Sequence, residues 1–216
     1  MTVLLGAISD EGVVLAADTM VTRRSTGEVI SVNECKITQF SPTVAIASCG
    51  SSAVVYDCFE TIRAEIRANN LDINHVNDFI GCLLTRLQAI PHIYPDSEIS
   101  KMYAGFLVAG PDRAGELSLT KVEADGHYWF DRLSGKVQFT CMPPSDLEFA
   151  DVQSCFMKAA TALSQESPDV CLEEILQKTI LLVSQESATV SELADVWTLR
   201  ADRREGHLEL HDASQL

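Results

Sequence analysis

Four residues in the first fifty positions have types that together could carry out acyl transfer: Thr2, Asp18, Lys36 and Gly50. Thr2 directly follows Met1, so removal of the methionine would leave a hydroxyl and a free α-amino group on one residue. An α-amino group has a pKa of about 7.7 to 8.0, which makes it a general base near neutral pH. The pattern therefore predicts an N-terminal threonine nucleophile.

The other three residues supply what such a nucleophile needs. A Lys36 ammonium near Thr2 would stabilise alkoxide-like charge, and the Asp18 carboxylate would hold that lysine in position. Gly50 precedes an expected helix, whose first N–H groups can bind an oxyanion. Each residue alone also fits an ordinary turn, surface or helix-entry role. Their joint occurrence with Thr2 is what predicts a site.

Strands and helices must bring these residues together, and the hydrophobic pattern predicts both. Apolar runs at 3–8 and 13–17 flank a turn, which indicates a hairpin in which Gly12 supplies a positive φ. Further apolar runs predict strands at 28–32, 36–40, 43–48, 103–109, 116–122, 127–130, 136–141, 195–201 and 206–211. Asp18 then follows the second strand, and Lys36 opens a later one.

Two pairs of helices interrupt the strands. Apolar residues at helical spacing predict a helix that begins near Ser51 and Ser52, and a second from about 74 that ends at Pro91. A later pair is expected at 145–165 and 168–186, with Ser167 and Pro168 at the start of its second helix. The order strands, two helices, strands, two helices, strands predicts an α+β fold in a single domain, 1–216. Its expected form is a four-layer α-β-β-α sandwich of two antiparallel sheets.

In these residues the chain resembles the β-type subunits of the proteasome family, including the ring-forming bacterial homologues, which are N-terminal-nucleophile hydrolases. The resemblance implies that Thr2 attacks the peptide carbonyl and that Lys36 lowers the pKa of the catalytic pair. It implies that Asp18 holds the lysine and that the Gly50 N–H receives the oxyanion. The interval from Lys36 to Gly50 fits without a gap, whereas the 22–33 hairpin carries a two-residue insertion.

The resemblance also implies substrate-binding positions. Thr22 would hold the substrate backbone, and the small residues Val21, Ser48 and Ser52 would line an open pocket. Met20 departs from the family pattern, because an arginine or a polar residue is common at its position.

Two supporting segments also differ from the family. Residues 141–145 replace a Gly-Ser-Gly segment before the third helix. The aspartate and serine that support the nucleophile after the fourth helix align only with Glu186, Ser187, Thr189 or Ser191.

Composition limits the remaining functions. The chain has 16 Lys+Arg and 31 Asp+Glu residues, a formal net charge of −15, so we expect no nucleic-acid or anionic-membrane partner. With neither a transmembrane span nor a signal peptide in the sequence, we expect a cytoplasmic protein. Seven widely spaced cysteines without a CxxC pair predict buried thiols, and we expect no metal and no cofactor.

The sequence therefore favours a threonine endopeptidase that cleaves unfolded proteins or peptides inside a self-compartmentalising homo-oligomeric ring. The family resemblance also makes an ATPase a possible regulator. Two alternatives stay open. One is a ring-forming homologue that binds or scaffolds with little or no peptidase activity. The other is an N-terminal-nucleophile amidase or transferase that acts on a small amide.

Overall fold

The computed structural model describes residues 2–22, 26, 28–95, 102–124, 128–133, 138–167, 169–203 and 205–212. A first sheet has the strand order β10-β1-β2-β11-β12, and a second sheet has the order β5-β6-β7-β8-β9. All pairs of neighbouring strands are antiparallel.

The first sheet consists of β1 (Leu4–Ser9), β2 (Gly12–Asp18), β10 (Gln138–Met142), β11 (Leu193–Arg200) and β12 (His207–Asp212). The second consists of β5 (Ile37–Gln39), β6 (Ala45–Gly50), β7 (Ala104–Pro111), β8 (Leu117–Ala124) and β9 (Tyr128–Leu133). A separate hairpin pairs β3 (Val21–Thr22) with β4 (Val29–Ser31). The helices are α1 (Ser52–Arg67), α2 (Val76–Ile93), α3 (Phe149–Glu166) and α4 (Leu172–Glu186).

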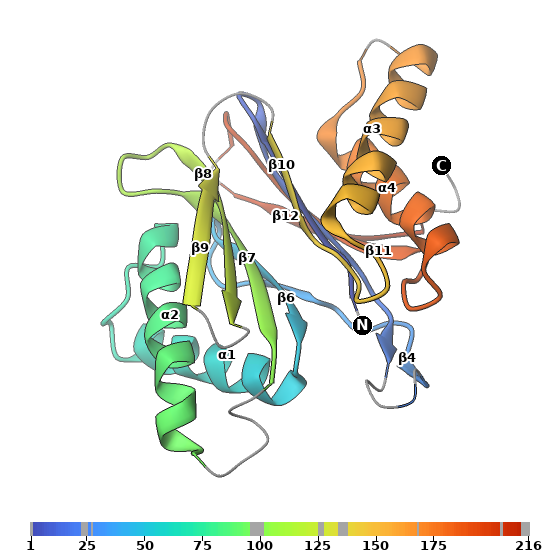
Figure 1. The fold of residues 1–216 in the computed structure, drawn as a ribbon. Helices are drawn as coiled ribbons and strands as arrows, with labels where there is room; N and C mark the ends of the chain where they lie inside the picture. The colour runs from blue at the N-terminus through green and yellow to red at the C-terminus, as the bar shows by residue number, and fades with distance from the viewer. Residues whose placement is uncertain are drawn as a thin grey trace.

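The sheets stack face to face, with α1 and α2 outside the second sheet and α3 and α4 outside the first (Figure 1). This is the predicted four-layer α-β-β-α sandwich. In strand β2 the residues before Asp18 form a continuous apolar run rather than an alternating pattern. Val14 and Ala16 pack toward α3 and α4, while Leu15 and Ala17 pack between the sheets, so both faces of the strand are buried.

The prediction of a positive φ at Gly12 is wrong, because the glycines with positive φ in the described part of the chain are Gly50, Gly110 and Gly115. Gly12 is instead needed for space. A Cβ at this position would lie 2.7 Å from the Leu199 carbonyl oxygen of the neighbouring strand β11. Close approach between strands, rather than the turn, explains this glycine.

The predicted helix ends also require correction. Pro91 does not stop α2, which continues to Ile93, because a proline in the last turn removes only its own hydrogen bond while Tyr94 N–H still donates to the Ile90 carbonyl. The third helix begins at Phe149 rather than near 145. The fourth begins at Leu172 rather than at 168, a residue that lies outside the described ones.

Among the described residues, no helix combines the length and the apolar character that a membrane span needs.

The aromatic centre between α1, α2 and the second sheet provides a test of the core. Phe79 is fully buried, and its ring centroid lies 5.7 Å from that of Phe40. We expect Phe79→Ala to lower the free energy of unfolding by about 3–5 kcal/mol in guanidinium titrations. Tyr56→Ala, at an aromatic residue with 67% exposure on α1, is the matched control and should change stability far less. Equal losses in both variants would contradict this packing.

Candidate active site

The centre of the site is a buried ion pair between the two sheets. Asp18 is the last residue of β2, and Lys36 directly precedes β5. Lys36 Nζ lies 3.1 Å from Asp18 Oδ1, with 7% of the lysine side chain and none of the aspartate exposed. The predicted ion pair between these residues is confirmed.

Backbone N–H groups hold the Asp18 carboxylate in place. Oδ1 also accepts a hydrogen bond of 2.9 Å from the Val3 N–H, and Oδ2 accepts one of 3.0 Å from the Met20 N–H. Burial raises the pKa of Asp18, while Lys36 and these N–H groups oppose that rise. The carboxylate is therefore fixed in one orientation by partners on three sides.

Lys36 is held just as firmly at its charged end. Besides Asp18, its ammonium donates to the Met20 carbonyl oxygen. Two of the three ammonium N–H groups thus have acceptors among the described residues, and one is left for a reacting group. Burial lowers the pKa of Lys36 from its ordinary value of 10.5, and the Asp18 charge opposes this.

Thr2 is connected to the ion pair through the next residue in the chain, Val3. It is half-buried and precedes Val3, whose N–H binds the same Asp18 oxygen as Lys36. The Asp18 N–H donates in return to the Val3 carbonyl at 3.3 Å, which continues the β1–β2 ladder. Met1 lies outside the described residues, and a contact between the Thr2 hydroxyl and the Lys36 ammonium stays a prediction.

Gly50 is connected to Lys36 through strand β6. The Ser48 N–H donates to the Lys36 carbonyl at 2.9 Å, and Gly50 ends the same strand. Gly50 has φ +99°, and a Cβ there would lie 2.3 Å from the Tyr103 carbonyl oxygen, so only glycine fits. Ser51 occupies the N-cap position of α1 without a capping bond from its side chain, and Gly50 therefore lies at a helix start as predicted.

The predicted substrate-binding residues lie on two segments, one directly after Met20 and one that runs from β6 into α1. Val21 and Thr22 form β3, immediately after Met20, and both are half-buried. Ser48 is bonded to Lys36 through its backbone, and Ser52 is the exposed first residue of α1. Their role in binding substrate stays a prediction.

The structure distinguishes among the four residues that the sequence left open, of which Glu186 ends α4 and the other three follow it. Ser191 reaches the ion pair, since its N–H lies 3.5 Å from Asp18 Oδ2 and its Oγ accepts from the Thr19 N–H at 3.2 Å. Glu186 instead lies 3.6 Å from the Lys158 ammonium on α3. Ser191 is therefore the residue of this loop that supports the carboxylate.

Ser187 and Thr189 form a second polar cluster with Asp146. Asp146 is a residue that the sequence analysis did not single out. The Ser187 hydroxyl donates to the Asp146 carboxylate at 2.9 Å and lies 2.9 Å from the Thr189 hydroxyl. Asp146 comes from the loop before α3, directly after the segment 141–145 that departs from the family pattern. The bond joins that loop to the loop after α4.

Asp195 is the second residue that sequence reasoning missed. It is 5% exposed on β11, and its Oδ2 accepts a 2.9 Å hydrogen bond from the Lys36 backbone N–H. A charged residue between the apolar Ala194 and Val196 was the available signal.

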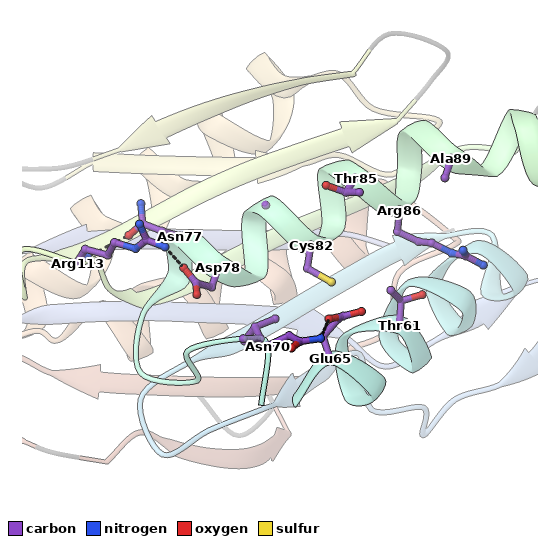
Figure 2. A pocket seen from close by; sticks show the side chains of 12 residues that line it. Thr61, Glu65, Asn70, Asn77, Asp78, Cys82, Thr85, Arg86, Ala89 and Arg113 are labelled. Atoms are coloured by element: carbon purple, nitrogen blue, oxygen red, sulfur yellow. Dashed lines mark hydrogen bonds and ion pairs between the residues drawn. The ribbon is translucent and has the colours of Figure 1, made fainter. Parts of the chain in front are cut away.

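Two other features lie apart from these residues. No group of three or more histidine, cysteine or acidic side chains in the described ranges is placed to hold a metal ion. A groove of about 490 Å³ runs between α1 and α2, with the Arg113–Asp78 ion pair (2.6 Å) at one end (Figure 2). None of the predicted site residues lines it.

Two stacked antiparallel sheets between helical layers are the fold of the proteasome-type N-terminal-nucleophile hydrolases. The family model of the proteasome subunits matches residues 2–142, so the chain belongs to the proteasome subunit family. Among solved structures, eukaryotic HslV from Trypanosoma brucei is similar with a TM-score of 0.62 and 19% identity, over 92% of this chain and 99% of that chain. None of the curated proteins matches the chain.

The ion pair provides a test of stability. Asp18→Ala leaves the Lys36 ammonium buried without its counterion, and we expect a loss of about 3–5 kcal/mol in the free energy of unfolding. Adding Lys36→Met should restore part of that loss, because the stranded charge is gone. Lys158→Met, at a lysine with 61% exposure, is the control and should have little effect. A double variant as unstable as Asp18→Ala would contradict the buried-charge interpretation.

Proposed function

We propose that this chain is a threonine endopeptidase subunit of a self-compartmentalising homo-oligomeric ring, with Thr2 as the nucleophile after removal of Met1. One observation carries the proposal. The Val3 N–H and the Lys36 ammonium bind the same oxygen of Asp18, and Thr2 is the residue directly before Val3. Membership of the proteasome subunit family and the likeness to HslV support it.

In the proposed reaction the free α-amine of Thr2 takes the proton of its own hydroxyl, and Oγ attacks the substrate carbonyl carbon. The remaining N–H of Lys36 stabilises negative charge on Oγ, while Asp18 keeps the ammonium in position. The tetrahedral oxyanion accepts a hydrogen bond from the Gly50 N–H at the start of α1. Collapse expels the substrate amine, which takes the proton from the Thr2 amine, and water then hydrolyses the ester.

The substrate in this proposal is an unfolded protein or a peptide. Val21 and Thr22 form a short strand beside Met20, and an extended substrate would add to such a strand through backbone hydrogen bonds. Ser48 and Ser52 are small, so they leave space for the residue before the cut. The cytoplasmic location and an ATPase regulator belong to the same proposal.

A ring-forming homologue with little or no peptidase activity is the second candidate, and the loop before α3 favours it. In that loop residues 141–145 replace the expected Gly-Ser-Gly segment, and Asp146, directly after them, is bonded to Ser187. A small shift of supporting groups can cost a large factor in rate. An amidase or transferase on a small amide has no such observation in its favour.

Chemical labelling tests the nucleophile. We expect the intact mass of the purified protein to show loss of Met1, and a peptide epoxyketone to form a covalent adduct on Thr2, since this reagent reacts with a hydroxyl and an amine of one residue. Thr2→Ala should abolish both labelling and peptide cleavage without unfolding the protein. A folded ring that keeps an accessible N-terminal Thr2 and remains unlabelled would favour the scaffold candidate.

The dependence of cleavage on pH tests the general base. The Thr2 amine must be neutral, and the nearby Lys36 charge should bring its pKa below the usual value of about 7.7 to 8.0, so the rate should rise through the neutral range. Burial lowers the pKa of Lys36, so the rate should fall again before pH reaches the ordinary lysine value of 10.5. If replacement of a histidine, such as His75→Gln, removed the rise of the rate through the neutral range, the assignment of the Thr2 amine as the general base would be wrong.

A further inference from the structure

Asp195 is a buried carboxylate that the proposed reaction does not use. It lies on β11 opposite Ala17 of β2, and on the same face of the strand as Trp197, which packs between the sheets. Its Oδ2 accepts the Lys36 N–H at 2.9 Å, across 159 residues of sequence. The bond joins the first sheet to the segment that enters the second.

Lys36 is consequently held at both ends by carboxylates from adjacent strands. Asp18 on β2 binds its ammonium, and Asp195 on β11 binds its backbone N–H. Because β2 and β11 are paired in register from Ala194 to Arg200, the two carboxylates form one rigid frame. This frame fixes both the backbone of Lys36 and the position of its ammonium group.

A structural role alone does not explain a charge at this position. An asparagine oxygen would accept the Lys36 N–H equally well, whereas a carboxylate with 5% exposure loses most of its hydration. Burial raises the pKa of Asp195, opposed by the Lys36 N–H and the Cys35 thiol. The positive charge of Lys36 also favours the ionised form of Asp195.

We propose that Asp195 is a positioning residue for the reaction: it fixes the backbone of Lys36, and its negative charge adds to that of Asp18 in stabilising the Lys36 ammonium. The inference rests on the proposed function. The groups that act on the Lys36 charge are Asp18 from β2, Asp195 from β11 and Cys49 from β6. Burial raises the pKa of Cys49 to about 12, so this thiol stays neutral at working pH and only the two carboxylates supply charge.

Two substitutions separate charge from position. Asp195→Asn removes the charge and keeps an oxygen for the Lys36 N–H, while Asp195→Ala removes both. Asp112→Asn is the matched control, because Asp112 is 8% exposed and its Oδ1 accepts backbone N–H groups in the β7–β8 turn. Three quantities are measured: the alkaline limb of peptide cleavage, the pH midpoint of Lys36 acetylation by acetic anhydride, and hydrogen exchange of the Lys36 amide.

We expect Asp195→Asn to lower both the pH at which cleavage declines in alkali and the acetylation midpoint by about 0.5 to 1 pH unit, with a smaller loss of kcat at neutral pH than in Asp195→Ala. Asp195→Ala should show the same shift, faster exchange of the Lys36 amide and at least about a tenfold loss of kcat with little change in KM. Asp112→Asn should behave as wild type in every measurement.

If Asp195→Asn changes neither the alkaline limb of cleavage nor the pH midpoint of Lys36 acetylation, the electrostatic part of the proposal is overturned. Unchanged amide exchange in Asp195→Ala would overturn the positioning part. If the wild-type protein neither cleaves peptides nor labels at Thr2, the proposed function fails. The acetylation midpoint and amide exchange would still decide the effect of Asp195 on Lys36, because neither needs catalysis.

Discussion

The structure depends on one buried charge, the ammonium of Lys36 in the space where the two sheets meet. A lysine with 7% exposure is stable there only because Asp18 lies 3.1 Å away and because the Met20 carbonyl oxygen accepts a second hydrogen bond from its ammonium. Such a pair contributes little to net stability, since desolvation of both ions offsets their attraction. Its value is geometric, because it fixes one lysine at one end of the sandwich.

The antiparallel sheets make that geometry possible. Strand β2 ends at Asp18, β6 ends at Gly50, and β5 begins just after Lys36, so three strand ends meet at one edge of the sandwich. Apolar packing on both faces of each sheet keeps these ends from shifting relative to one another. The apolar packing between the sheets and against the helices therefore keeps Asp18, Lys36 and Gly50 in fixed relative positions.

The loops on the α3–α4 side support the same cluster with an unexpected set of residues. Ser191 contacts Asp18, while Ser187 ties its loop to Asp146 in the loop before α3. The family resemblance predicts an aspartate and a serine after the fourth helix and a serine before the third. Here the aspartate, Asp146, is before α3 and the serine, Ser187, is after α4. The hydrogen bond between them joins the two loops.

The sequence alone determined the elements and the residues whose partners are near in the chain. Apolar periodicity predicted the four helices and most of the strands, and the family resemblance at Asp18 and Lys36 predicted the ion pair. Tertiary structure decided the rest: Asp195 and Ser191 meet Lys36 and Asp18 across 159 and 173 residues. It also decided that Gly12 makes room for β11, which no turn pattern records. Local pattern reflects the energetics of neighbouring residues, whereas contacts between distant strands exist only once the sheets have paired.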